Sequence, residues 1–249
     1  MKLIRTILIS LLLIGSSLSS FGQGQISRNS SSGQKSKPKT ESASQYKTPK
    51  HLSLATVNGA GAQCFFSIED WETLNKNKQA QYKKIGVCVI VNNHSFIVAG
   101  RDAERGELSW RSYQDGIVPG LRCFSTKESA CQDFNGKSNS AILKSVNSPS
   151  ATAACMYRAF PGDKTEWYLP ACGQLWIMSQ NAFAINKALN DFGLAKFRST
   201  PAYNSSTQYG VEKFSNRSYS WGWGVNLSSA SVYKYGGCNN DYVRSVADL

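Results

Sequence analysis

The sequence has little of the side-chain chemistry on which most enzymes depend. Only two of its 249 residues are histidines, His51 and His94. Two isolated histidines do not build a histidine-rich metal site or a Ser-His-Asp triad. The glycine-rich fingerprints of nucleotide-binding enzymes are also absent. We therefore expect no catalytic residues, no metal site and no cofactor.

Acidic side chains are few as well. The chain has 16 Asp and Glu against 28 Lys and Arg, a net charge of +12. Residues 1–22 carry +2 and residues 23–50 carry +5, which leaves only +5 for residues 51–249. Because a nucleic-acid-binding surface needs clustered basic residues, we expect no nucleic-acid partner. The basic stretch is either a solvated linker or a segment that touches anionic surfaces by Coulomb attraction.

Apolar runs long enough to cross a membrane are missing. The run at residues 7–14 falls short of the roughly 20 residues that a membrane span needs. Lys2 and Arg5 precede it, and small residues stand at Ser20 and Gly22. This pattern predicts a cleavable signal peptide over residues 1–22 rather than an anchor. We expect an exported protein that is periplasmic, secreted or on the cell surface, with no membrane span after cleavage.

The next segment is poor in large apolar side chains. Residues 23–60 are rich in Ser, Gln, Lys, Thr and Gly, and such a segment buries too little surface to offset its ordering entropy. We predict a disordered basic linker over 23–60 and a folded domain over 61–249.

Within the domain, helical and strand patterns do not alternate regularly. The apolar, β-branched run at 85–91 predicts a buried strand, and 96–99 a second one. Residues 150–160 predict one helix, and 173–192 two more. From Pro201 onward the pattern returns to strands and long loops. This order predicts an α+β domain with an antiparallel sheet, a few short helices and long loops.

Seven cysteines occur, and their spacing matches no recognisable framework. In an oxidising compartment some should pair, and the odd number leaves at least one thiol over. The alternative is that several are buried free thiols, as expected for Cys88 inside its apolar strand. The positions are 64, 88, 123, 131, 155, 172 and 238.

Four motifs follow one another in the second half of the chain: 167–175 (WYLPACGQL), 202–209 (AYNSSTQY), 220–223 (SWGW) and 242–246 (YVRSV). They resemble the W-[RY]-L-P-x-x-x-E-L, Y-W-S-S-T-E, A-W and V-R-x-V-R pattern of a bacterial C-type-lectin-like family, the major paralogous domain type. That family includes the C-terminal domain of a collagen-like adhesin and is similar in fold to the formylglycine-generating enzymes. The resemblance covers about residues 65–249 and implies a C-type-lectin-like domain.

The departures from the family pattern are specific. Gln174 and Gln208 stand where the family has Glu, and Asn204 where it has Trp. We therefore carry over no metal or charge role from those acids. Residues 205–207 are suited to hydrogen-bond loop backbone, and we expect Arg244 to satisfy buried carbonyls or pair with an acid. The fold resemblance would allow calcium, but Asp241 and Glu212 alone do not supply its several oxygen ligands.

The C-terminal part has an unusual composition. Of the 40 residues from 203 to 242, 24 are Tyr, Ser, Gly or Asn, the types favoured in antibody binding loops. Alternation places Tyr219, Trp221 and Trp223 on one strand face, which we expect to be the core face, with a sugar-stacking platform as the alternative.

The stretch 233–242 has almost no aliphatic residues, which predicts a loop that is either solvated or part of a ligand surface. It is also similar to the variable ends of retroelement-diversified proteins on the same fold. Tyr233 and Tyr235 would be stacking anchors, and Lys234 would contact anionic groups. The candidate ligand-binding residues are Tyr209, Arg217, Tyr233, Lys234, Tyr235, Asn239, Asn240, Asp241 and Tyr242.

These observations favour an exported, non-catalytic module that binds a surface glycan or protein through its C-terminal loops. One alternative is a structural or tip subunit of a surface appendage. Another is a copper oxidase, because the formylglycine-generating enzymes use a pair of cysteines on copper and thiolates suit Cu(I). Here the C-terminal region offers Cys238, and Cys172 is the nearest other cysteine.

Overall fold

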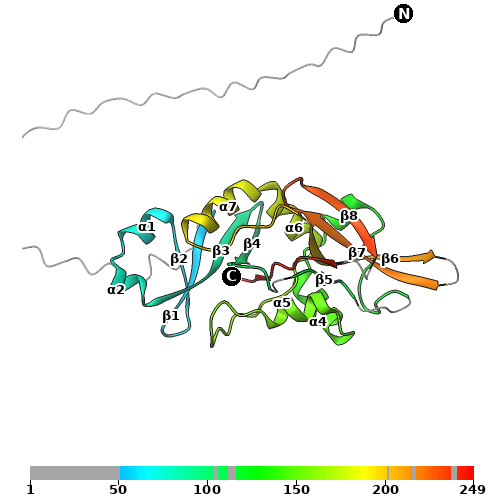
Figure 1. Ribbon diagram of the computed structural model, residues 1–249, viewed down its shortest axis with the longest axis horizontal. Coiled ribbons are helices and arrows are strands. Elements are labelled where there is room, and N and C mark those ends of the chain that lie inside the picture. The colour runs from blue at the N-terminus through cyan, green and yellow to red at the C-terminus, as the bar shows by residue number, and fades with distance from the viewer. Residues whose placement is uncertain (1–50, 104–105, 112–115, 201, 215–216, 237–239) are drawn as a thin grey trace, which may run out of the picture. The chain divides into compact units, whose positions relative to one another are not determined.

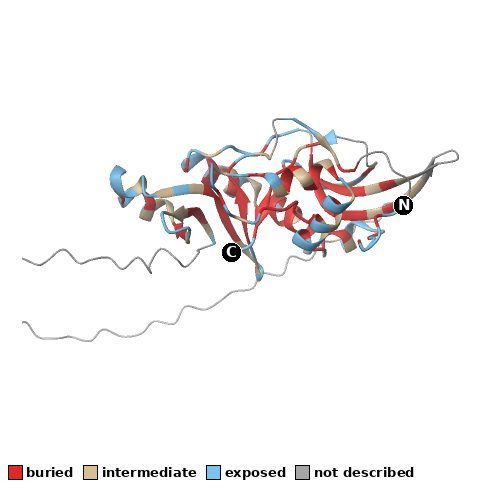
Figure 2. Ribbon diagram, turned by 90° about the horizontal axis from the view of Figure 1, so that it is seen from below, coloured by how far each residue is buried: buried red, intermediate tan, exposed pale blue. Residues whose placement is uncertain are grey.

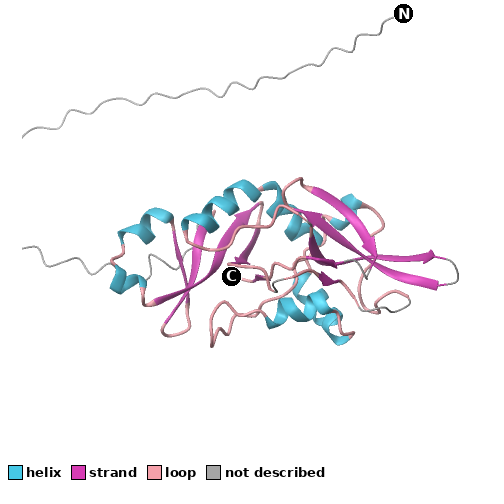
Figure 3. Ribbon diagram, in the orientation of Figure 1, coloured by secondary structure: helices cyan, strands magenta, loops and turns pink. Residues whose placement is uncertain are grey.

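A computed structural model describes residues 51–249 apart from 104–105, 112–115, 201, 215–216 and 237–239. The predicted signal peptide and residues 23–50 of the predicted linker lie outside the described residues. Within the described ranges, no helix is long and apolar enough to cross a membrane. In chain order (Figures 1 and 3) the elements are β1 (Leu52–Asn58), β2 (Gln63–Phe66), α1 (Ile68–Thr73), α2 (Lys76–Gln79), β3 (Tyr82–Val91), β4 (His94–Ala99), β5 (Leu108–Ser109), α3 (Lys127–Ala130), α4 (Gly136–Ser145), α5 (Pro149–Met156), α6 (Cys172–Gln180), α7 (Ala182–Asp191), β6 (Tyr203–Phe214), β7 (Arg217–Asn226), β8 (Ser231–Gly236), β9 (Asn240–Asp241) and β10 (Val246–Ala247).

The predicted strands at 85–91 and 96–99 form the centre of a five-stranded antiparallel sheet. Its strand order is β10-β4-β3-β1-β2. Val87 packs on one face in the core cluster that includes Leu189 of α7, and Cys88 packs on the other face with Trp167. Because both faces are covered, the strand needs a continuous apolar run rather than an alternating one. Figure 2 shows the buried residues following this sheet.

The same sheet corrects the predicted domain boundary at residue 60. Strand β1 lies inside the predicted linker, yet it pairs with β2 on one side and with β3 on the other. Leu54 and Ala55 are fully buried there. The short apolar alternation of residues 52–57 is hidden by the polar composition of the long segment before it. The folded domain therefore includes β1.

The helical predictions hold with one change. The stretch 173–192 forms α6 and α7. The helix predicted at 150–160 is α5, but it ends at Met156. The Asp163 carboxylate accepts a hydrogen bond from the Ala159 amide at 2.9 Å, which holds this backbone in a turn instead of a further helical turn.

The C-terminal residues form a three-stranded antiparallel sheet in the order β6-β7-β8. The predicted loop over 233–242 is wrong in its first part, since residues 231–236 are strand β8 paired with β7. Two glycines of β7 explain the difference. A Cβ on Gly222 would lie 2.8 Å from the ring of Trp110, and one on Gly224 would lie 2.8 Å from the ring of Tyr235. Aromatic rings fill the glycine gaps, so a loop-like composition packs as a sheet.

A buried network around Asp133 joins two of the motif segments. Its carboxylate accepts hydrogen bonds from the hydroxyl of Thr207 at 2.7 Å and from the side-chain amide of Asn139 at 2.9 Å. The Thr207 oxygen also accepts from the backbone N–H of Cys172 at 2.8 Å. This contact confirms that the 205–207 segment hydrogen-bonds neighbouring backbone.

Gln174 and Gln208 are both buried, and each uses both ends of its side-chain amide. Gln174 accepts from the N–H of Ala171 at 2.9 Å and donates to the hydroxyl of Tyr168 at 3.1 Å. Gln208 accepts from the N–H of Val118 at 2.6 Å and donates to a backbone carbonyl. A carboxylate could not donate in either place, so these two amides hold loops.

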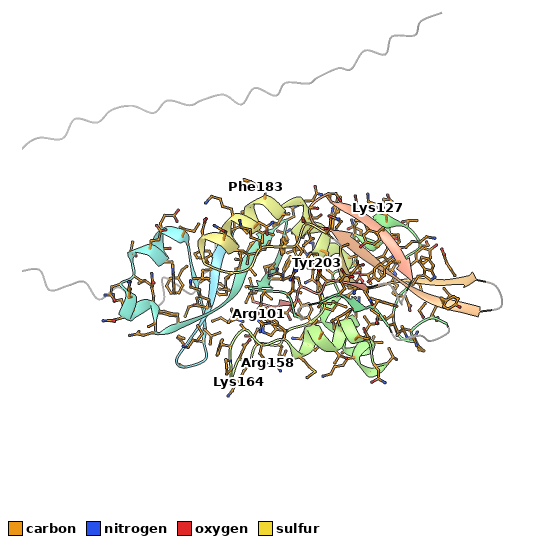
Figure 4. The ribbon with its side chains drawn as sticks, viewed as in Figure 1. Arg101, Lys127, Arg158, Lys164, Phe183 and Tyr203 are labelled. Carbon is orange, nitrogen blue, oxygen red and sulfur yellow. The ribbon has the colours of Figure 1, made fainter. Side chains whose placement is uncertain are left out.

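Arg244 does both of the things expected of it. Its side chain is fully buried and forms an ion pair with Asp102 at 2.9 Å. The hydroxyl of Tyr203, labelled in Figure 4, lies 3.3 Å from the same carboxylate. The Arg244 guanidinium also donates to three backbone carbonyls, of Ala99, Ala195 and Lys196, at 2.9–3.1 Å.

Candidate functional site

The structure divides the predicted ligand residues between the two faces of the β6-β7-β8 sheet. In the pairing of β7 with β8, Trp223 lies opposite Lys234, and Gly222 lies opposite Tyr235. Since side chains alternate along a strand, Lys234 shares a face with Trp223, whereas Tyr235 lies on the other face. We call these the outer face and the inner face.

On the inner face the predicted residues belong to the core. Tyr235 is only 2% exposed, and its ring packs against Gly224. Tyr233 donates a hydrogen bond to the carboxylate of Asp241 at 3.1 Å, and Asp241 is itself buried. The structure therefore places Tyr235 and Asp241 in the core and not on the predicted ligand surface. The ring of Tyr235 fills the space that Gly224 leaves.

Asp241 gives this network a pH dependence. Burial raises the pKa of its carboxyl above the usual Asp range, although hydrogen bonds from Tyr233 and from the Ala202 amide oppose the shift. The folded chain then binds this proton more tightly than the unfolded chain. Stability from this group is therefore lost as the pH rises from the ordinary Asp pKa through the raised value.

We expect Asp241→Asn to remove this loss, because the amide oxygen still accepts from Tyr233 but no charge forms. Urea unfolding between pH 4 and 7 should show stability falling less with pH in the variant than in the wild type. Asp191→Asn, which breaks the exposed ion pair with Lys187, is the control and should track the wild type. Parallel curves for Asp241→Asn and the wild type would contradict the expectation.

On the outer face, an exposed cation lies over two aromatic rings. The Nζ of Lys234 is 4.8 Å from the ring centroid of Tyr209 and 5.5 Å from that of Trp221. Glu212 forms an ion pair with the same ammonium and raises its pKa. All four side chains are at least partly exposed. We call Tyr209, Glu212, Trp221 and Lys234 the Lys234 cluster.

The rings of the Lys234 cluster stand on a packed support. The ring of Tyr209 meets that of Trp223 edge-on at a centroid distance of 5.5 Å. Trp223 is buried, and its indole N–H donates to the carbonyl of Phe124 at 2.9 Å. Although Trp223 lies on the outer face of the sheet, it is covered by other residues and belongs to the core, as expected from the sequence. Trp221, which was also expected in the core, is only half-buried. A rigid aromatic surface results.

Two more cation–ring pairs come from a segment that showed no site signal in the sequence. The guanidinium of Arg122 lies 4.9 Å from the ring of Phe124, and Lys127 lies 5.6 Å from the ring of Trp176. Phe124 donates its N–H to the carbonyl of Gln208 at 3.0 Å, which fixes this segment beside β6. In the sequence, the only signal for these pairs was that basic and aromatic residues lie close together near Arg122, Phe124 and Lys127.

The remaining predicted residues do not join the cluster. Tyr242 is half-buried, with the guanidinium of Arg198 at 4.8 Å from its ring. Asn240 is exposed on β9 and pairs with Ser109. Arg217 is the first residue of β7, and its backbone alone is described. Asn239 and Cys238 lie outside the described residues. The structure thus brings Tyr209 and Lys234 together out of the predicted set.

A separate cavity of about 760 Å³ lies between the β1–β2 turn, residues 160–166 and the C-terminal residues. Three of its charged side chains are paired, because Lys137 lies 2.8 Å from Glu166 and 3.2 Å from Asp248. Asp248 also accepts from the hydroxyl of Tyr168 at 2.7 Å. The sequence did not predict this cavity, and it shares no residue with the Lys234 cluster.

Among the described residues, no three His, Cys, Asp or Glu side chains lie close enough together to bind a metal ion. Cys238, the cysteine of the copper alternative, lies outside those residues, so that alternative stays a prediction.

Comparison with known proteins rests on structure alone. No model of a protein family matches the sequence, and no curated protein matches it significantly. The fold is similar to that of a fimbrial protein from Bacteroides ovatus ATCC 8483, with a TM-score of 0.53 and 13% sequence identity. The match covers 79% of this chain but only 48% of the fimbrial protein. The chain therefore spans about half the length of that protein, and the likeness concerns the fold.

Proposed function

We propose that this chain is an exported surface-recognition module with a C-type-lectin-like fold, and that it binds a glycan or protein through the outer face of the β6-β7-β8 sheet. The ordered motifs support the fold, and the similarity to part of a fimbrial protein fits a place at the cell surface. The observation that carries the proposal is the Lys234 cluster, an exposed cation held over two supported aromatic rings.

The chemistry of this cluster suits an amphipathic ligand. Aromatic rings offer a large apolar face at low entropic cost, and the C–H faces of sugar rings or the side chains of a protein can pack on it. Lys234, which lies over the rings, and Glu212, which pairs with it, supply a donor and an acceptor next to that apolar surface. The indole of Trp221 packs against Gly236 on the neighbouring strand β8, which restricts its position. Few rotamers must be frozen on binding, which favours affinity.

Replacing Trp221 by alanine should weaken ligand binding about tenfold or more, a loss of about 1.4 kcal/mol or more. The probes are neutral mannose oligosaccharides and sulfated chondroitin oligosaccharides, measured by isothermal calorimetry on the exported chain at 50 and 500 mM NaCl. Lys234→Ala should weaken binding mainly of the sulfated probe and mainly at low salt.

The matched control is Lys187→Ala, which removes an exposed, ion-paired lysine on α7. A probe that binds both Trp221→Ala and Lys187→Ala as tightly as the wild type would place its site elsewhere and contradict the proposal. If neither probe binds the wild type, the glycan form of the proposal is lost and a protein ligand remains to be tested.

The second candidate is a subunit of a surface appendage, which the fimbrial fold neighbour favours. A subunit should self-associate as the chain concentration rises. Sedimentation velocity from micromolar to near-millimolar concentration should then show growing oligomers that Trp221→Ala leaves unchanged. A monomer at all concentrations would count against this candidate.

A further inference from the structure

Two cysteines from distant segments lie side by side in the core. Cys131 caps the end of α3, and Cys172 is the first residue of α6. Both thiols are unpaired in the structure, and they lie close enough for each to shift the pKa of the other. Both belong to the same core cluster, with exposed fractions of 8% and 0%.

The backbone holds the two segments at this distance. The N–H of Gly173 donates to the carbonyl of Asp133 at 2.9 Å. A Cβ on Gly173 would lie 2.8 Å from the carbonyl oxygen of Cys131. The backbone of residues 131–133 therefore passes directly against the start of α6. Thr207 fastens the same two segments, because it bonds both Asp133 and the N–H of Cys172. Close, fixed backbones are what a disulfide requires.

Among the other described cysteines, Cys64 belongs to the same core cluster and Cys155 packs against it, but neither shifts the pKa of Cys131 or Cys172. Cys64 and Cys88 belong to different core clusters, on opposite faces of the five-stranded sheet. Cys155 is half-buried on α5, and Cys123 is exposed beside the side-chain amide of Gln208, at 3.2 Å. The Cys131–Cys172 contact therefore distinguishes one pairing that the sequence left open.

We propose that Cys131 and Cys172 form a disulfide when the chain folds in an oxidising compartment, by exchange with a disulfide oxidant such as oxidised glutathione or a thiol–disulfide oxidoreductase. The thiolate of one of the two cysteines attacks one sulfur of the oxidant, and the first oxidant thiolate leaves. The thiolate of the other cysteine then attacks the protein sulfur of this mixed disulfide, and the second oxidant thiolate leaves. The two cysteines are oxidised, and the oxidant accepts two electrons and both thiol protons.

The two thiols shift each other's pKa in opposite directions. The hydrogen bond with Cys172 lowers the pKa of the Cys131 thiol; burial opposes this, and the nearby Lys127 ammonium reinforces it. The pKa of Cys172 is raised, mainly by the same hydrogen bond and by burial. The disulfide would tie α3, which carries Lys127, to α6, which carries Trp176.

Peptide mass analysis tests the pairing directly. The full chain is refolded in mixed oxidised and reduced glutathione, blocked with N-ethylmaleimide under denaturing conditions and digested with trypsin. Trypsin places Cys131 in peptide 128–137 and Cys172 in peptide 165–187, each with one cysteine. We expect the two peptides joined, and separated by reduction. Both peptides blocked before reduction, or either joined to a third cysteine, would overturn the proposal.

A thermal measurement gives a second, independent readout. Dithiothreitol should lower the Tm of the oxidised wild type by about 5–10 °C. It should lower the Tm of Cys155→Ser by the same amount, and it should leave the Tm of Cys131→Ser unchanged. This comparison is made within each variant, so any loss of stability from the substitution itself cancels. An equal dithiothreitol effect in Cys131→Ser and the wild type would contradict the pairing.

Discussion

Replacing Arg244 by methionine should lower the free energy of unfolding by about 3–5 kcal/mol. Its guanidinium is fully buried, pairs with Asp102 and donates to three backbone carbonyls. Methionine keeps much of the volume but removes every donor. The buried carboxylate then loses its closest cation, and desolvated carbonyls are left without partners. Urea unfolding at pH 7 measures the loss, which corresponds to a fall in Tm of about 10 °C.

Arg198 supplies a matched control, because it approaches the same carboxylate from the surface. Its Nε lies 3.4 Å from Asp102, and its side chain is half-exposed. Exposed ion pairs contribute about 0–1 kcal/mol, so Arg198→Met should cost no more than that. Combining Asp102→Asn with Arg244→Met should cost less than the two single losses added together, since the partners share one interaction. Equal losses for Arg198→Met and Arg244→Met would refute this account.

The second large effect is expected at Asp133. Asp133→Ala should cost about 3–4 kcal/mol, because several donors, including Thr207 and Asn139, lose a buried acceptor and an unpaired buried polar group costs about 1–3 kcal/mol. The substitution also frees Thr207, which supports the start of α6 through its contact with Cys172.

Two variants at related positions sharpen the measurement at Asp133. Asp133→Asn keeps one acceptor oxygen and should lose about half as much as the alanine variant. Asp191→Ala removes an exposed carboxylate and should change stability by less than about 0.5 kcal/mol. An Asp133→Ala variant within 1 kcal/mol of the wild type in urea unfolding would show that the network is not a stabilising junction.

The sequence predicted those parts of the fold that depend on local pattern. The apolar run of β3 identifies a strand covered on both faces, and the stretch 173–192 gave both helices. The structural role of Arg244 was also predicted, since it was expected to satisfy buried carbonyls or pair with an acid, and it does both. Strand β1 was missed because its short apolar alternation follows a long polar segment.

The candidate site was predictable only in part. Tyr209 and Lys234 were identified by residue type, yet their grouping with Trp221 depends on the strand register of β6, β7 and β8. The contact between Trp223 and Phe124 joins residues 99 positions apart, and no local pattern encodes it. Tyr235 was misassigned because the glycine that receives its ring lies on the neighbouring strand.

The alternation of glycine and tryptophan along β7 has a consequence for how this surface can change. Gly222 and Gly224 accept rings from the core on the inner face, whereas Trp221 on the outer face points toward Lys234 and solvent. One strand thus separates the positions that maintain the fold from a position on the proposed binding surface. Exchanging Trp221 or Lys234 alters the chemistry of the proposed binding surface, while the glycine–ring contacts and the buried Trp223 stay in place. The proposed specificity can therefore change at these two positions at little cost in stability.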